Sequence, residues 1–313
     1  MGTSLSCFNS EALPHSARGE KVVVITGCDS GFGQQLALHA AHVLGFKVVA
    51  ACLSVEGEKY IHDALQNTGG AVVQADLIEA AGLQKLLSAV EKVAESVGGG
   101  IWALVNNAGI VLPGNVEWNP PAAYEKTMGI NFHVPVNLTY ALLPRIKKEK
   151  GRIMNVTSVD GFIALPSNAA YNASKHALEA YSDTLRMEMM PWGVNVIVVE
   201  PATMRTPLAM SYWDAWLKSY EDASEDRTPH GNAWARGVAA KGREALEAIA
   251  ADPQITVFAM AEALVTKQPK IRYKTGKMAK FFFKPMSMLP HFIQDKLLMG
   301  MTFGTKPPAL AQM

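Results

Sequence analysis

Three side chains spaced along one stretch of the chain could together move a proton. Tyr171 and Lys175 are four residues apart, so on a helix they lie on the same face. A lysine ammonium beside a phenol stabilises the phenolate and lowers a pKa that is normally about 10. Tyr171 could then accept a proton from an alcohol, or donate one to a carbonyl, near neutral pH. Ser158, thirteen residues before Tyr171, could hold the same substrate oxygen by a hydrogen bond.

A glycine-rich segment near the N-terminus could bind a dinucleotide. It reads Thr26-Gly27-Cys28-Asp29-Ser30-Gly31-Phe32-Gly33 and directly follows an apolar run. Gly27 would allow a sharp turn, Gly31 a close approach to a diphosphate, and Gly33 close packing of a helix on a strand. The G-x-x-x-G-x-G spacing is a weak signal by itself. Its place between a strand and a helix favours dinucleotide binding over an ordinary tight turn.

The end of the second apolar run bears on which dinucleotide is bound. An acid usually stands there and binds the adenosine ribose. Here the run ends at Cys52-Leu53, and the nearest acids are Glu56 and Glu58. No arginine or lysine stands at this point to pair with a 2′-phosphate, and Asp29 in the turn would repel one. The sequence therefore predicts NAD in preference to NADP.

The elements that must position these residues alternate along the chain. Apolar runs rich in Val, Ile and Ala lie at 22–25, 48–51, 71–73, 102–105, 152–156 and 194–199, with a shorter run at 271–273. Strands that are apolar on both faces and separated by helices pair in parallel with right-handed crossovers. We therefore predict a single α/β domain, a Rossmann-type three-layer αβα sandwich with a parallel sheet. Ligands would bind at the carboxyl ends of its strands.

Changes in composition divide the chain into three parts. Residues 1–20 are small and polar and are expected to form a flexible leader, and residues 21–276 the dinucleotide-binding catalytic domain. Within that domain, residues 207–250 break the strand–helix rhythm and favour a helical lid. Residues 277–313 are expected to form a C-terminal extension.

Five motifs taken together resemble the short-chain dehydrogenase/reductase family over about residues 20–275. They are the turn at 26–33, Asn106-Asn107-Ala108-Gly109, Asn131, Ser158 and Tyr171-x-x-x-Lys175. The resemblance implies that Tyr171 is the acid/base and that Ser158 orients the substrate. It implies that Lys175 binds the nicotinamide ribose and tunes Tyr171, and that Asn131 holds a water in a proton relay.

The same resemblance assigns contacts to the cofactor. Asp76, followed by Leu77, matches the family residue near the adenine ring. Pro201 and Thr203 belong to a segment beside the nicotinamide, in which Ala202 replaces the usual glycine. The implied cofactor contacts are Thr26, Gly27, Asp29, Ser30, Gly31, Phe32, Gly33, Asp76, Leu77, Asn107, Ala108, Gly109, Tyr171, Lys175, Pro201 and Thr203.

Several motifs resemble more closely a subgroup of retinol, hydroxysteroid and 3-hydroxybutyrate dehydrogenases. The likeness lies in the turn at 26–33, in Ala51-Cys52-Leu53 and in Val199-Glu200-Pro201. The subgroup mostly favours NAD and lacks the acid after the second strand, as this chain does. Family members usually pair through two long helices, so the resemblance implies a homodimer or homotetramer.

Apolar residues in the expected lid favour a lipophilic substrate, such as a retinoid- or steroid-type alcohol. The same residues could instead pack the lid on the domain. The candidate substrate contacts are Ser158, Met204, Leu208, Trp213 and Trp216. The sequence thus predicts an NAD-dependent oxidoreductase that interconverts a secondary or lipophilic alcohol and its carbonyl.

Two alternatives stay open. One is a 3-hydroxybutyrate dehydrogenase, in which Arg205 or Arg236 would bind the carboxylate. The other is a catalytically silent nucleotide-binding sensor, against which the intact Ser158, Tyr171 and Lys175 argue.

Composition limits the remaining partners. The net charge is +1, so no overall field attracts nucleic acid. The three cysteines include no C-x-x-C pair, and the eight histidines show no ligand spacing, so we expect no bound metal and a reducing compartment. No apolar run of membrane-spanning length is present. We expect an intracellular protein, cytoplasmic or peripheral on an intracellular membrane, rather than a mitochondrial one.

Both ends of the chain carry patterns typical of peripheral membrane contact. Gly2 fits an N-myristoylation pattern, with Cys7 placed for palmitoylation. Residues 270–284 contain six basic residues and no acid, and include Phe281-Phe282-Phe283, a composition that suits a membrane interface. The alternative is a C-terminal helix that packs near the substrate entrance.

Overall fold

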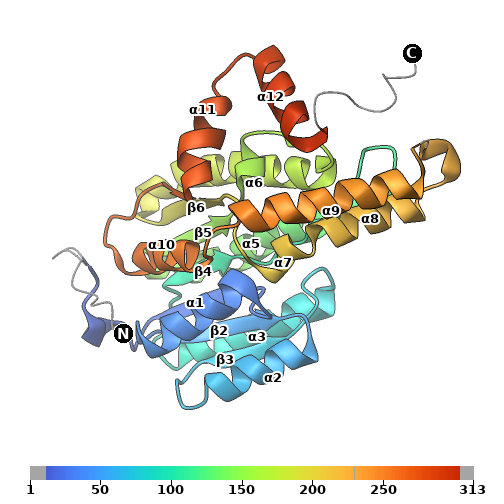
Figure 1. The fold of residues 1–313 in the computed structure, drawn as a ribbon. Coiled ribbons are helices and arrows are strands. Elements are labelled where there is room, and N and C mark those ends of the chain that lie inside the picture. The colour runs from blue at the N-terminus through green and yellow to red at the C-terminus, as the bar shows by residue number, and fades with distance from the viewer. Residues whose placement is uncertain (1–11, 229, 304–313) are drawn as a thin grey trace.

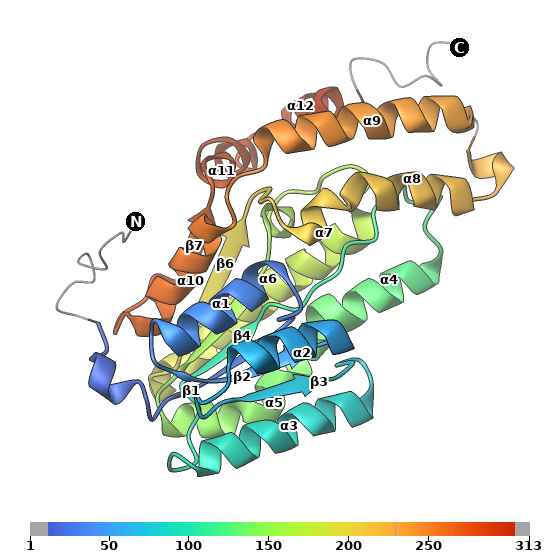
Figure 2. The same cartoon turned by 60° about the horizontal axis from the view of Figure 1, so that its bottom comes forward.

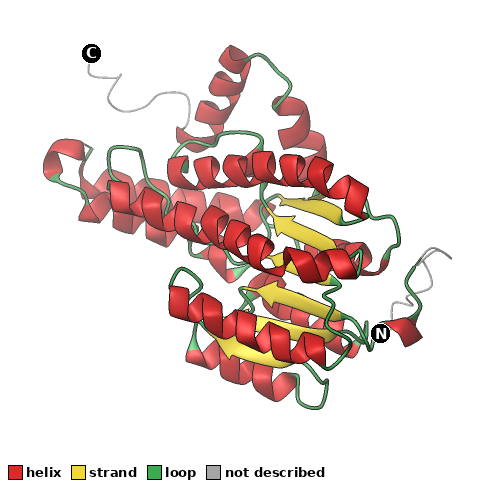
Figure 3. Cartoon of the chain, turned by 180° about the vertical axis from the view of Figure 1, so that it is seen from behind, coloured by secondary structure: helices red, strands yellow, loops and turns green. Residues whose placement is uncertain are grey.

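A computed structural model describes residues 12–228 and 230–303. Its centre is a seven-stranded sheet, ordered β3-β2-β1-β4-β5-β6-β7, in which every neighbouring pair is parallel. The strands are β1 (Val22–Thr26), β2 (Lys47–Cys52), β3 (Ala71–Gln74), β4 (Ala103–Asn106), β5 (Arg152–Val156), β6 (Asn195–Pro201) and β7 (Arg272–Thr275). Helices lie on both faces (Figure 1; Figure 3). The predicted three-layer αβα sandwich with a parallel sheet is confirmed.

Successive side chains of each strand are buried on opposite faces of the sheet, because side chains alternate along a strand. In β1, Val23 and Ile25 join one core cluster, whereas Val22 and Val24 join the other. The first cluster packs under α1 (Gly31–His42), α2 (Val55–Ala64) and α10 (Gln254–Val265). The second packs under α3 (Ala80–Glu95), α5 (Val134–Lys148) and α6 (Ala169–Met189).

Shorter helical segments connect these elements. They are η1 (His15–Ala17), α4 (Pro121–Met128), η2 (Gly129–His133), η3 (Val159–Gly161), η4 (Met190–Trp192) and η5 (Glu225–Arg227). Two of them matter for the site: η2 is a π-helical turn before α5, and η3 directly follows Ser158. Single π-helical turns inside α-helices are frequent at functional sites.

After β6 the chain forms a helical hairpin that extends beyond the sheet (Figure 2). It consists of α7 (Pro207–Met210), α8 (Tyr212–Asp222) and α9 (Gly231–Ile249). Aromatic side chains fill the space between α8 and α9. Trp216 and Tyr220 are buried there against Trp118, with ring centroids 5.1 and 5.0 Å from that indole.

The C-terminal segment packs beside the loop that follows Ser158. It contains η6 (Ala279–Phe283), α11 (Lys284–Met286) and α12 (His291–Phe303). Phe283 and Met286 share a buried cluster with Val159 and Ile163 of that loop. Figure 1 shows α11 and α12, in red, on the α6 side of the molecule.

Residues 12–20 differ from the flexible leader that the sequence predicts there. The Leu13 amide donates to the Val265 carbonyl over 2.7 Å, and Arg18 donates back to the Leu13 carbonyl over 2.6 Å. Leu13 also packs against the first core cluster. These contacts fix the segment on the end of α10. Gly2 and Cys7 lie outside the described residues.

Candidate active site

The glycine-rich turn between β1 and α1 is shaped by close contacts that exclude a side chain. Gly27 has a φ of +70°, in the left-handed region that favours glycine. A Cβ on Gly33 would lie 2.1 Å from the Gly27 carbonyl oxygen, so α1 can approach the strand only because Gly33 lacks one. The side chain of Ser30, which precedes α1, caps none of the first amides of the helix. Those amides are therefore available to an anion, so this turn fits the diphosphate of a dinucleotide.

Asn107, after β4, ties the turn to the neighbouring strand. Its side-chain amide donates to the carbonyl oxygens of Thr26 (2.8 Å) and Gly27 (3.1 Å). In return, the Thr26 hydroxyl accepts from the amides of Asn107 and Ala108 at 3.1 and 3.0 Å. The carboxyl ends of β1 and β4 therefore form one rigid edge, which is where a Rossmann-type sheet binds its ligand.

The side chain of Asp29 extends from the glycine-rich turn to the end of β2. Its carboxylate accepts from the Leu53 amide at 2.9 Å, and from the amide and hydroxyl of Ser54 at 2.7 Å each. Ser54 is the N-cap of α2. Asp29 thus places a carboxylate at the end of β2, at a helix N-terminus that would otherwise favour an anion.

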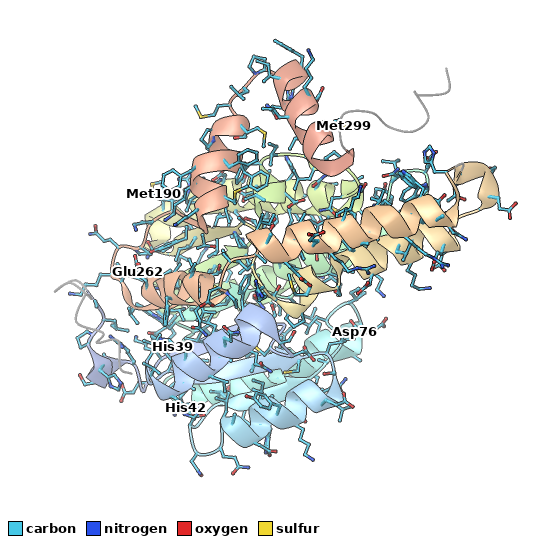
Figure 4. The ribbon with its side chains drawn as sticks, in the orientation of Figure 1. His39, His42, Asp76, Met190, Glu262 and Met299 are labelled. Carbon is cyan, nitrogen blue, oxygen red and sulfur yellow. The ribbon has the colours of Figure 1, made fainter. Side chains whose placement is uncertain are left out.

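Asp76 lies in the loop after β3, with an exposed side chain that accepts from the Ile78 amide at 3.1 Å, while Leu77 is buried. Figure 4 places Asp76 on the side of the molecule where α7 and α8 lie, and His39 and His42 at the other end of α1. His39 packs edge-on against Phe258, with ring centroids 5.7 Å apart. Within the described ranges, no group of three or more His, Cys, Asp or Glu could hold a metal ion.

Ser158, Tyr171 and Lys175 meet where η3 packs against α6. Ser158 follows β5, and its hydroxyl is close enough to the Tyr171 phenol to lower the pKa of that phenol. Lys175, one helical turn after Tyr171, is 3% exposed, and its ammonium nitrogen lies 5.5 Å from the centroid of the Tyr171 ring. The ammonium donates to the Val156 carbonyl at 2.8 Å. The structure therefore brings the three predicted catalytic side chains together.

The electrostatics of this cluster differ from the sequence-based expectation. Burial raises the pKa of Tyr171 above 10, and the negative charge of Asp160 adds to the rise, while the nearby Ser158 hydroxyl opposes it. Burial also lowers the pKa of Lys175 from 10.5 to about 8. The sequence predicts a lowered pKa for Tyr171, whereas among the chain's own groups the pKa is raised, and desolvation of the phenol is the largest cause.

Asn131 lies in the π-helical turn η2, beside the lysine. Its side-chain amide donates to the Ile110 carbonyl (2.9 Å) and to the Ser174 hydroxyl (3.0 Å), and its oxygen accepts from the Ile110 amide (2.9 Å). Both amide hydrogens are therefore engaged with protein groups. A Cβ on Gly109 would lie 3.4 Å from the Asn131 oxygen and 3.6 Å from the Lys175 nitrogen, so the three residues adjoin. The water relay at Asn131 stays a prediction.

Pro201 and Ala202 are buried at the end of β6, and the Ala202 amide donates to the Thr275 carbonyl at 3.1 Å. The Thr203 carbonyl accepts from the Ala251 amide at 3.0 Å. Residues 201–203 therefore lie at the carboxyl end of β6, between β5 and β7.

The candidate substrate contacts have different surroundings. Trp216 is fully buried in the aromatic cluster between α8 and α9, and Trp213 faces Gly242, where a Cβ would lie 2.1 Å from the indole. Met204 is buried, whereas Leu208 is 42% exposed. The two tryptophans thus join the helices of the hairpin, which favours packing of the lid as their role.

Two residues that the sequence does not single out as site residues face the catalytic cluster. Asp160 is buried, and its carboxylate accepts from the Ser158 hydroxyl and from the Asn168 side-chain amide, at 2.9 Å each. Tyr212, at the start of α8, is close enough for Asp160 to contribute to the rise of its pKa, which burial dominates. In the sequence, Asp160 is marked only by its position two residues after Ser158. Tyr212 is one of several aromatic residues in the lid.

The arginines proposed for a small carboxylate substrate are exposed and already have partners. Arg205 donates to the Glu247 carbonyl at 3.1 Å. Arg236 lies 3.7 Å from Glu221, between α9 and the end of α8. Neither contact brings a guanidinium to Ser158 or Tyr171.

No helix in the part of the chain that the structure describes is long and apolar enough to cross a membrane.

A parallel sheet with a glycine turn after its first strand, and a Ser–Tyr–Lys cluster beside it, define a Rossmann-fold oxidoreductase. The sequence model of the short chain dehydrogenase family matches residues 21–216. The 17-beta-hydroxysteroid dehydrogenase type 6 of Bos taurus is 35% identical over 286 residues, 89% of this chain and 88% of that protein. Retinol dehydrogenase 7 of Rattus norvegicus is 33% identical over 298 residues, 93% of this chain and 91% of that protein.

Solved structures show the same fold. A short chain dehydrogenase/reductase from Burkholderia phymatum in complex with NAD aligns with a TM-score of 0.69, over 92% of this chain and 97% of that chain, at 22% identity. The chain belongs to the short chain dehydrogenase family, in the subgroup related to retinol and hydroxysteroid dehydrogenases. It is thus an oxidoreductase that acts on CH–OH groups with a nicotinamide cofactor, and the resemblance seen in the sequence is confirmed.

Proposed function

We propose that this oxidoreductase interconverts a lipophilic alcohol of the retinoid or steroid type and its carbonyl, with NAD as cofactor and Tyr171 as acid/base. The observation that supports this most is the position of the Ser158 hydroxyl near the Tyr171 phenol, next to the buried ammonium of Lys175. The names of the related proteins support the substrate class. The apolar lid and C-terminal segment beside the Ser158 loop agree with it.

The residues of the chain divide the reaction between them. NAD would accept the hydride and bring a positive charge that favours the Tyr171 phenolate. Tyr171 takes the proton of the alcohol, and Ser158 holds the same oxygen by a hydrogen bond. Lys175 holds the ribose and, below a pH of about 8, contributes a positive charge near the phenol. The amides of the glycine turn hold the diphosphate.

A substrate panel tests the reaction class and separates the alternatives. Purified protein is mixed with NAD or NADP and with all-trans-retinol, 3α- and 17β-hydroxysteroids, or 3-hydroxybutyrate, and the absorbance of the reduced cofactor is followed. We expect turnover of a retinoid or steroid with NAD. Turnover of 3-hydroxybutyrate alone would replace the lipophilic substrate. Tight NAD binding without turnover of any substrate would favour a nucleotide-binding sensor.

The same assay with Asp29→Asn tests the cofactor preference. The wild-type carboxylate at the N-terminus of α2 repels a 2′-phosphate, and the amide does not. We expect the ratio of kcat/KM for NADP to that for NAD to rise about tenfold, the effect of one charge at roughly 4 Å in a partly exposed site. Asp63→Asn removes an exposed charge from the same helix and should leave the ratio unchanged. An unchanged ratio in Asp29→Asn would mean that another feature selects NAD.

We also propose that the C-terminal segment contacts an anionic membrane surface. Phe281, Met288 and Phe292 are 78%, 76% and 65% exposed, and the exposed Lys280 and Lys284 stand among them. Apolar and basic side chains on one segment suit a lipid interface, with each lysine contributing about 1 kcal/mol on anionic lipid.

Flotation of the protein with vesicles measures this contact. We expect binding to vesicles that contain phosphatidylserine, and a weakening of roughly tenfold or more in Lys280→Ala/Lys284→Ala. A Gly2→Ala variant made in cells separates any contribution of N-terminal acylation at Gly2 and Cys7. If the wild-type protein stays with the unbound fraction, the membrane proposal fails.

A further inference from the structure

A buried carboxyl group lies at the centre of the site, and the acid/base mechanism does not use it. Asp160 belongs to η3 and is 6% exposed. Carboxylates are seldom buried to this degree without a charged partner. Among the described residues, no ion pair holds the Asp160 oxygens. Both of its hydrogen-bonding partners, the Ser158 hydroxyl and the Asn168 amide, are neutral.

The contact with Ser158 decides what that hydroxyl can offer a substrate. A hydroxyl has one proton to donate and two lone pairs. The Ser158 hydroxyl donates that proton to the Asp160 oxygen at 2.9 Å and accepts from the Asp160 amide at 3.2 Å. While Asp160 is ionised, Ser158 therefore has no proton left for a substrate oxygen. The lone pair that remains cannot hold the alcohol in its place, because Tyr171 takes the single hydroxyl proton of that alcohol.

Protonation of Asp160 reverses this arrangement. The carboxylic acid would donate its own proton to the Ser158 oxygen, and the Ser158 proton would be free to donate to a carbonyl oxygen. We propose that Asp160 is a positioning residue that sets the direction of the Ser158 hydrogen bond, so that protonated Asp160 lets Ser158 donate to the substrate oxygen and ionised Asp160 withholds that donor. This inference rests on the proposed function of Ser158 as the residue that holds the substrate oxygen.

The groups around Asp160 determine when it ionises. Burial raises the pKa of Asp160 above 3.8, while its hydrogen bonds to Asn168 and Ser158 and the positive charge of Lys175 oppose the rise. Tyr171 of α6 and Tyr212 of α8 also face it. Because the pKa is raised, the protonated form persists to a higher pH than in an exposed aspartate.

Charged side chains from other elements also lie near η3. A Cβ on Gly161 would lie 2.8 Å from the Glu179 side chain. Lys274 of β7 and Lys284 of α11 lie 6.0 and 5.5 Å from the centroid of the Phe162 ring. The direction of the pKa shift of Asp160 follows from burial, its largest cause.

Asp160→Asn tests the inference because the amide keeps both contacts. Its oxygen can accept from Asn168 and its NH₂ group can donate to Ser158, as protonated Asp160 would. With the substrate pair that the panel identifies, we expect the KM of the carbonyl to fall about tenfold at pH 8, the effect of one hydrogen bond. In the wild type, the KM of the carbonyl should rise with pH as Asp160 ionises, and in the variant this rise should disappear.

An exposed aspartate of α2 provides the control. Asp63→Asn removes an exposed carboxylate from α2 and should leave both KM values unchanged. If Asp160→Asn weakens alcohol and carbonyl alike and keeps the wild-type pH dependence, Asp160 is only structural and the inference is overturned.

A measurement without substrate separates this inference from the proposed function. Infrared difference spectra recorded against pH should show the protonated carboxyl of Asp160, and the band should be absent in Asp160→Asn. Ser158→Ala removes a donor that lowers the pKa of Asp160, so we expect ionisation at a higher pH in that variant. An unchanged titration in Ser158→Ala overturns the coupling, even if no substrate in the panel is turned over. Failure of the panel with an intact coupling would overturn the proposed function alone.

Discussion

Replacing Tyr171 with phenylalanine is expected to lower alcohol oxidation by about 10²- to 10⁴-fold, the usual contribution of a general acid/base. The phenyl ring keeps the volume and packing of the tyrosine on α6 and loses only the hydroxyl that would take the proton. The amides of the glycine turn, which would hold the diphosphate, are not affected. We therefore expect the dissociation constant of NAD to change little.

The pH dependence gives this prediction a second readout. Burial and Asp160 raise the pKa of Tyr171, so the phenol keeps its proton at neutral pH unless a positive charge is added. Oxidation by the wild type should therefore rise with pH as Tyr171 ionises, and the residual activity of Tyr171→Phe should lack that rise. Tyr60→Phe, at an exposed position on α2, is the matched control and should behave as the wild type. An active Tyr171→Phe enzyme with the wild-type profile would contradict the assigned role.

Gly33→Ala is expected to weaken NAD binding by about 100-fold or more. The added Cβ would lie 2.1 Å from the Gly27 carbonyl oxygen and 2.5 Å from the Asn107 side-chain nitrogen. To relieve these contacts, either the start of α1 must move away from β1 or the turn must open, and both displace the amides that face the diphosphate. Overpacking of this kind costs about 1–3 kcal/mol of stability.

Calorimetric titration with NAD and thermal unfolding measure the two effects. Gly237→Ala, on α9, is the matched control, because a Cβ there meets no atom within 4 Å. Alanine is the better helix former by about 1 kcal/mol, so the control should be slightly more stable and should bind NAD as the wild type does. Wild-type NAD affinity in Gly33→Ala would show that the close approach of α1 to β1 is not needed for binding.

The parallel sheet and the layers of the fold could be predicted because they depend on local patterns. Apolar runs separated by helices leave few arrangements other than a parallel sheet covered on both faces. Contacts between distant segments could not be predicted. Leu13 packs against the first core cluster and bonds to Val265, which is 252 residues away, and a polar leader carries no mark of this partner.

Part of the site could also be predicted, because that part depends on local patterns. Ser158, Tyr171 and Lys175 belong to motifs with a recognisable spacing, and the structure brings them together. Asp160 belongs to no such motif, and its importance comes from burial and from its contact with Ser158. Trp213 and Trp216 could be read as substrate contacts, because apolar side chains look alike in sequence whether they line a pocket or pack between helices.

The amino-acid sequence by itself determined the fold class, the family and the candidates for the reacting side chains. Spacing along one segment decides which residues share a helix face and where a glycine permits a turn. Only the tertiary structure decided the protonation behaviour of those side chains. The pKa of Tyr171 rises rather than falls because several segments together remove water from the phenol and place Asp160 beside it. Desolvation depends on everything that surrounds a group in space, and no local pattern records it.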